Sequence, residues 1–179
     1  LLHAAKELGL DVHLTAINHW DVAIATHRKN HPDAEHLCTN IEDVKPRAVV
    51  PGGHVDLLVA SPECIHFSRA RGGQPTSDQL RVSPWLVLEW LEKLDVTRVL
   101  IENVPDLISW GPVDAKTGKP IKKKKGRTFK SYLAALRSLG YMVDYRVINC
   151  ADYGDATTRE RLFIMARKDE YPHWPEPTH

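Results

Sequence analysis

The chain has 179 residues, a formal net charge of +1 and 42% hydrophobic residues, which is enough to bury a core and ordinary for a globular domain. No apolar run approaches the roughly 20 residues of a membrane-spanning helix. Three scattered cysteines form neither a disulfide framework nor a zinc pattern, and His27, His31 and His36 show no ligand spacing with cysteine or carboxylate. We expect no metal, no membrane segment and a cytoplasmic setting.

The two ends of the sequence indicate a piece of a larger protein. The chain starts without methionine inside a helical pattern over residues 1–8, and its last residues, WPEPTH, are typical of a linker. The first residues also lack the order of a signal peptide. We therefore treat residues 1–179 as one incomplete domain, and we expect a monomer.

Helical and strand patterns alternate along the rest of the chain. We predict helices at 22–30, 84–94 and 129–139, and strands at 12–17, 57–60, 99–101, 141–148 and 162–166, with a further short strand and turn within 38–43. This order predicts an α/β fold, Rossmann-like and doubly wound, with a mostly parallel sheet and an antiparallel strand pair near its end.

Reactive residue types follow two of the buried strands. Cys64 comes just after the strand 57–60, and Glu102 comes just after the strand 99–101. Open α/β sheets keep their chemistry at the carboxyl ends of their strands, so both positions are candidates. A lone cysteine is more often a small core residue than a nucleophile, and a lone glutamate often caps a helix or turn. The alternative for Glu102 is a partly buried carboxyl that hydrogen-bonds or protonates a ring nitrogen.

Two groups of basic residues also allow two interpretations each. Arg159 and Arg161 can pair with surface acids such as Glu160 or Asp155, or they can anchor a base carbonyl or a phosphate, for which the guanidinium fork is suited. The run at 122–127, KKKKGR, is either a solvated loop or a phosphate contact.

Taken together, these segments resemble the DNA cytosine C5-methyltransferase family. The similar motifs occur in family order: Ile17-Asn18-His19-Trp20-Asp21, Thr39-Asn40-Ile41, Ser61-Pro62-Glu63-Cys64 with Phe67-Ser68, Glu102-Asn103-Val104, and Asp152-Tyr153-Gly154 followed by Arg159-Glu160-Arg161. The resemblance covers nearly the whole chain. It implies a sheet of the type found in S-adenosylmethionine-dependent methyltransferases.

The resemblance also implies catalytic roles. The thiolate of Cys64 would attack C6 of cytosine, which makes C5 nucleophilic, and Glu102 would act at the ring nitrogen N3. Arg159 and Arg161 would hold the base and its surroundings. The target base would leave double-stranded DNA to reach this pocket. We thus expect an enzyme of bacterial or phage origin, as in restriction-modification, that methylates DNA.

The implied cofactor is S-adenosylmethionine. Trp20 would form a wall against its adenine ring, and Asn40 and Ile41 would border the same ring. Pro62 would shape the side from which the methyl group is donated.

Several features depart from the family pattern. The glycine-rich first motif, the target-recognition region and the last motifs are absent from the sequence, so the chain by itself is expected to be inactive. Individual departures are His19, Asn40, Glu63 and Thr157. A carboxylate at Glu63 disfavours the neighbouring thiolate. Two alternatives remain: a transfer RNA cytosine C5-methyltransferase, and a non-catalytic relative that binds DNA or a partner protein.

Overall fold

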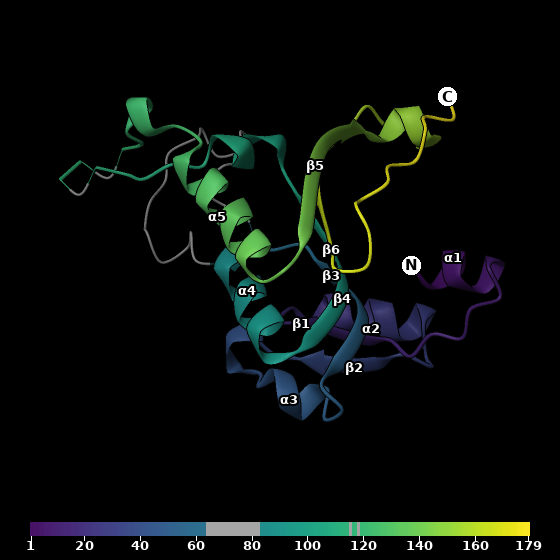
Figure 1. Ribbon diagram of the computed structural model, residues 1–179. Helices are drawn as coiled ribbons and strands as arrows, with labels where there is room; N and C mark the ends of the chain where they lie inside the picture. Colours follow the sequence, from purple (N-terminus) through teal and green to yellow (C-terminus); the bar gives the residue numbers. More distant parts are fainter. Residues whose placement is uncertain (64–82, 115, 118) are drawn as a thin grey trace. The chain divides into compact units, whose positions relative to one another are not determined.

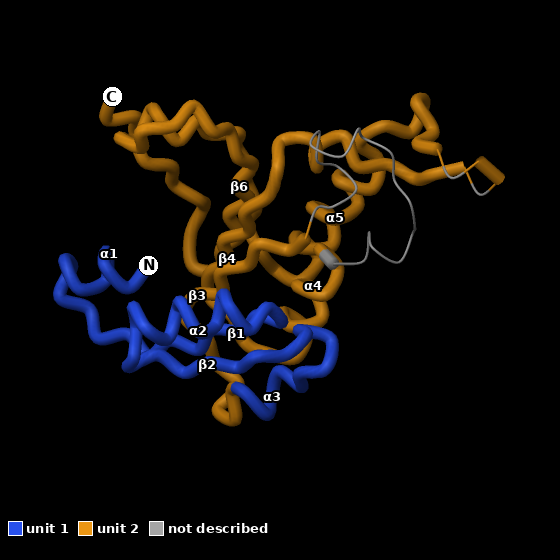
Figure 2. Tube along the Cα trace, turned by 180° about the vertical axis from the view of Figure 1, so that it is seen from behind, with its two compact units in different colours: residues 1–49 blue, residues 50–179 orange. Residues whose placement is uncertain are grey.

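The computed structural model describes residues 1–63, 83–114, 116–117 and 119–179. The predicted nucleophile Cys64 lies outside these residues. The chain divides into two compact units, residues 1–49 and 50–179, drawn in blue and orange in Figure 2. No helix within the described ranges is both long and apolar enough to cross a membrane.

The first unit is a small β-α-β arrangement. Its elements are α1 (Leu2–Glu7), β1 (Thr15–Asn18), α2 (Asp21–Asn30), β2 (Glu35–Cys38), the 3₁₀ helix η1 (Ile41–Asp43) and α3 (Pro46–Val49). β1 and β2 pair in parallel from Thr15 opposite Glu35 to Asn18 opposite Cys38. The two strands therefore end at the same edge, and the chain leaves this edge at Trp20 and at Asn40.

The second unit holds a four-stranded sheet in the order β3-β4-β6-β5 (Figure 1). Its elements are β3 (His54–Ala60), α4 (Ser83–Lys93), β4 (Asp95–Asn103), η4 (Pro105–Ser109), η5 (Lys122–Lys124), α5 (Arg127–Ser138), β5 (Met142–Asn149), η6 (Cys150–Tyr153) and β6 (Glu160–Arg167). β3 and β4 are parallel, whereas β6 is antiparallel to both of its neighbours. The predicted α/β class, with antiparallel pairing near the end, is confirmed.

Strand β4 is much longer than the apolar run that predicted it. The expected strand was 99–101, but pairing with β3 begins at Asp95 and pairing with β6 extends to Asn103. Polar side chains interrupt the apolar run without interrupting the backbone ladder, because backbone hydrogen bonds do not depend on side-chain polarity. Glu102 and Asn103 thus lie inside the strand rather than after it, and Arg161 likewise lies inside β6.

Aromatic packing fixes the segment that follows β4. The ring centroids of Trp85, Trp110 and Tyr132 lie 5.5 to 6.1 Å apart. Leu107 in η4 is fully buried, and Trp110 is almost so. Burial of large apolar side chains of this kind contributes about 1.5–3 kcal/mol each. The chain leaving β4 is therefore held by the core.

Two buried tyrosines offer a matched test of this core. The hydroxyl of Tyr141 donates a 2.7 Å hydrogen bond to the carbonyl of Val96, and burial, aided by Asp95, raises the pKa of Tyr141 to about 12. The hydroxyl of Tyr132 is buried without a hydrogen-bond partner in the described structure. We expect Tyr141→Phe to lower the free energy of unfolding by about 1–2 kcal/mol, and Tyr132→Phe to leave it unchanged or raise it. Urea unfolding measures both, and a larger loss for Tyr132→Phe would contradict the packing described.

Candidate active site at the carboxyl end of strand β4

A carboxylate and a guanidinium meet where β4 and β6 pair. In this ladder Glu102 lies opposite Phe163 and Asn103 lies opposite Leu162, so Arg161 follows at the end of the pairing. Nε of Arg161 lies 2.8 Å from Oε1 of Glu102, and the side chains are only 17% and 30% exposed, respectively. Nη1 of Arg161 also donates to the backbone carbonyl of Glu160 at 2.7 Å. Two contacts on one planar guanidinium fix its orientation.

The structure shows the contacts of three residues for which the sequence left two interpretations open. The side chain of Glu102 forms an ion pair across two strands. Arg161 contacts the backbone of Glu160. Arg159 precedes β6 with an exposed side chain, and its carbonyl accepts a hydrogen bond from the amide of Cys150. Among the described contacts, Arg161 and not Arg159 is therefore joined to Glu102.

Asn103 connects the same strand end to the exit of β3. Its side chain is only 3% exposed. Nδ2 donates to the carbonyl of Pro62 at 3.0 Å, and Oδ1 accepts from the amide of Val104 at 2.9 Å. Pro62 stands two residues before Cys64, so Asn103 fixes the start of the segment that carries the predicted nucleophile. The sequence analysis missed this role, although a polar side chain at the end of a buried strand must find partners.

The predicted cofactor residues of the first unit lie along one edge of its parallel strands. The amide of Thr39 donates to the carbonyl of Asn18 at 3.0 Å, so the chain segments after β1 and β2 stay side by side. Trp20 is 59% exposed and Ile41 is 37% exposed, while Asn40 precedes η1. Apolar side chains are thus exposed at the carboxyl edge of these parallel strands.

Three histidines that sequence spacing did not connect lie together in the first unit. Nδ1 of His27 lies 2.8 Å from Nε2 of His36, and the rings of His27 and His31 are 4.7 Å apart. Burial, followed by the charges of His31 and His36, lowers the pKa of His27. Spacing missed the cluster because His36 comes from the neighbouring strand. Within the described ranges, no group of three ligating side chains is arranged to hold a metal ion.

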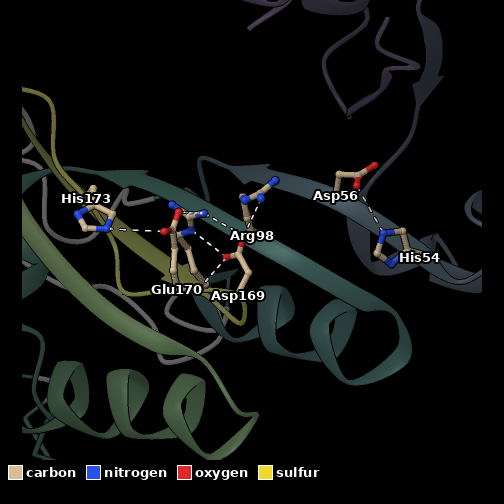
Figure 3. Close-up of polar contacts among 7 residues, drawn as sticks. His54, Asp56, Arg98, Asp169, Glu170 and His173 are labelled. Atoms are coloured by element: carbon tan, nitrogen blue, oxygen red, sulfur yellow. Dashed lines mark hydrogen bonds and ion pairs between the residues drawn. The ribbon is translucent and has the colours of Figure 1, made fainter. Parts of the chain in front are cut away.

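A second charged cluster lies at the opposite end of the β4–β6 pair (Figure 3). Asp169 accepts from Arg98 at 2.6 Å and from Arg167 at 2.9 Å. The hydrogen bonds from Arg167, and then from Arg98, hold the pKa of Asp169 well below its ordinary value. Arg98 stands near the start of β4 and Arg167 ends β6, so this cluster ties the segment after β6 to the sheet. We assign it to structure rather than to the candidate site.

Comparison with known proteins identifies sequence relatives. Residues 3–179 match a family model described as C-5 cytosine-specific DNA methylase. The type II methyltransferase M.AgeI of Thalassovita gelatinovora is 30% identical over 93% of this chain and 37% of its own length. DNA (cytosine-5)-methyltransferase 1A of Oryza sativa subsp. japonica is 30% identical over 82% of the chain and 9% of its own length. The chain thus spans well under half of these relatives.

Solved structures with a similar fold show lower identity. A mutant of Spodoptera frugiperda DNMT2 superposes with a TM-score of 0.67 at 22% identity, covering 99% of this chain and 50% of that one. The Dnmt2 methyltransferase of S. pombe gives a TM-score of 0.62 at 20% identity, covering 97% and 48%. These similarities support the fold assignment.

Proposed function

The chain belongs to the C-5 cytosine-specific DNA methylase family, and we propose that it is the catalytic part of an enzyme that methylates C5 of cytosine in double-stranded DNA. The observation that carries this proposal is the ion pair of Glu102 and Arg161 at the end of β4. A carboxyl beside a guanidinium can contact N3 and O2 of a cytosine ring, which carry the charge that develops when C6 is attacked.

The proposed reaction uses the side chains of Cys64 and Glu102. The thiolate of Cys64 adds to C6, the π electron pair of the C5–C6 double bond becomes delocalised from C5 to N3, and Glu102 stabilises the charge at N3. C5 then takes the methyl group. Removal of the C5 proton and cleavage of the Sγ–C6 bond restore the aromatic ring. The base reaches these groups only when flipped out of the duplex.

The proposal assigns further atoms of the Glu102–Arg161 ion pair to contacts with the cytosine ring. Oε1 of Glu102 and two nitrogens of Arg161 are engaged within the protein. In the proposed complex, Oε2 of Glu102 would contact N3 and Nη2 of Arg161 would contact O2 of the base. We assign Arg159, which is exposed, to the surroundings of the base rather than to its edge.

S-adenosylmethionine would supply an electrophilic methyl group when bound. Trp20 and Ile41 would hold its adenine ring with the apolar surface that they expose at the edge where β1 and β2 end, and Asn40 would border the same ring. Pro62 would border the methyl-donor side. Its carbonyl is fixed by Asn103, which gives that side a defined position on the sheet.

Covalent trapping tests the proposal most directly. The full-length protein that contains this chain, with S-adenosylmethionine and duplex DNA bearing 5-fluorocytosine, should form a denaturation-resistant adduct, because fluorine at C5 prevents proton removal. Cys64→Ser should abolish the adduct, whereas the control Cys38→Ser, at an exposed free cysteine, should retain it. The adduct is measured by gel mobility. Equal adduct from wild type and Cys64→Ser would refute the nucleophile assignment.

The same preparation separates the alternative functions. Labelled methyl incorporation into duplex DNA but not transfer RNA supports the proposal, and the reverse result supports the RNA enzyme. DNA binding without methyl transfer to either substrate would favour the non-catalytic relative.

The ion pair predicts a difference between the two arginines. Arg161→Lys should reduce kcat/KM about 10- to 100-fold, since lysine cannot reproduce a fork that contacts Glu102 and the Glu160 carbonyl together. Arg159→Lys, which keeps the charge at an exposed position, should cost less than about fivefold if it lacks a bidentate contact. Steady-state methylation kinetics measure both variants. An equal or larger loss at Arg159 would contradict the placement of Arg161 at the base.

Asn103 is proposed as a positioning residue, and a matched asparagine provides the control. Asn103→Asp removes the donor to Pro62 and should slow single-turnover adduct formation about 10-fold or more, with little change in DNA affinity. Asn149→Asp should have little effect, because the hydrogen bond of the Asn149 side chain within the described ranges is one that its oxygen accepts, from the amide of Ala151. If Asn103→Asp lowered thermal stability but left the adduct rate unchanged, the role would be structural only.

A further inference from the structure

Positive charge is concentrated in one part of the second unit. Between Asp114 and Asp144 the sequence contains nine lysines and arginines and no acidic residue, whereas the rest of the chain has 15 basic and 23 acidic residues. The net charge of +1 is therefore the balance between one strongly basic segment and a chain that is otherwise acidic. Such asymmetry produces a local field that attracts polyanions.

The densest part of this segment is residues 122–127, which we call the basic turn. Lys122–Lys124 form the 3₁₀ helix η5, and α5 begins at Arg127. The side chains of Lys122 to Lys125 and of Arg127 are all exposed. The first turn of α5 contains no acidic residue. The charges of the basic turn are thus presented to solvent without an acid from the turn itself.

The backbone of the basic turn is anchored to the segment after β4. The amide of Gly126 donates to the carbonyl of Ser109 at 3.0 Å, and Gly126 adopts a φ of +75°, which favours glycine. A Cβ on Gly111 would lie 2.4 Å from the carbonyl oxygen of Lys124, so only glycine permits this approach. A merely solvated loop requires no such close packing. The backbone of the basic turn is therefore held against the segment after β4, while its lysine side chains are exposed to solvent.

The basic turn is connected to the candidate site through η4. Glu102 and Asn103 end β4, and Pro105–Ser109 form the 3₁₀ helix that follows (Figure 1). A shallow depression runs between η4 and the basic turn, lined by Pro105, Asp106, Ile108, Ser109, Lys125 and Gly126. The same helix η4 thus links the chain that leaves the site to the residues that carry the charge.

We propose that the basic turn binds backbone phosphates of the DNA duplex whose cytosine is methylated. This inference rests on the proposed function. Lysine ammonium groups act as point charges on flexible stems, which suits phosphates of any sequence better than base edges. A 3₁₀ helix has three residues per turn, so the side chains of Lys122, Lys123 and Lys124 in η5 point in three different directions. This arrangement can reach more than one phosphate.

The salt dependence of DNA binding tests the proposal independently of catalysis. Each phosphate contact adds about 0.9 to the negative slope of log K against log salt concentration. Changing Lys122, Lys123, Lys124 and Lys125 together to glutamine should reduce the slope by about 2–4 for the full-length protein on duplex DNA. Fluorescence anisotropy without S-adenosylmethionine measures it. At saturating DNA, kcat should be unchanged while KM for DNA rises.

Two further variants control for charge and folding. Changing the same four lysines to arginine should keep the slope. A matched change of four exposed residues of the first unit to glutamine removes equal charge, at Lys6, Arg28, Lys29 and Lys45. This control should reduce the slope by less than about 1 if those side chains touch no phosphate.

The outcomes separate this inference from the proposed function. Equal slopes for the basic-turn variant and the first-unit control would overturn the inference even if methylation were normal. A reduced slope in a protein that does not methylate DNA would sustain the inference and refute the proposed function. A loss of binding to RNA but not to DNA would overturn the choice of DNA.

Discussion

The antiparallel pairing of β6 with β4 is the constraint on which the candidate site depends. Arg161 and Glu102 are far apart in sequence, and only this register brings their side chains to 2.8 Å. Buried side chains hold the register, since Ile101 and Ile164 face each other across the ladder and are almost fully buried. A slip by one residue would turn Arg161 to the other face of the sheet and expose apolar side chains. The packing energy of the core therefore also fixes the position of the charged pair.

Glu102 and Asn103, which are consecutive in β4, make contacts on opposite faces of the sheet. Successive side chains of a strand point to opposite faces. Glu102 remains 30% exposed and pairs with β6, whereas Asn103 is 3% exposed and reaches the exit of β3. One side chain is accessible to a ligand, and the next locks the neighbouring strand. These two residues thus contact β6 on one side and the segment after β3 on the other.

The sequence predicted the parts of the structure that depend on local pattern. Alternating periodicity predicted the α/β class, and the apolar run before Glu102 placed this residue at the carboxyl end of a buried strand. The extent of β4 and β6 could not be predicted, because backbone pairing continues through polar residues. Which arginine contacts Glu102, Arg161 rather than Arg159, depends on the cross-strand register, which no local pattern encodes. The same applies to His27 and His36, which meet only because β2 lies beside α2.

The candidate site and the proposed DNA contact depend on the same buried segment of the chain. Leu107 and Trp110 are buried on either side of the carbonyl of Ser109, which accepts the hydrogen bond from Gly126. The core that fixes the chain after Asn103 therefore also fixes the basic turn. Lysine side chains can remain mobile and still act from a defined position, because the order resides in the backbone beneath them. A phosphate bound there would stay within reach of the basic turn, which would limit where the duplex can lie relative to Glu102. Rigidity at the end of β4 would thus serve both chemistry and positioning of the substrate.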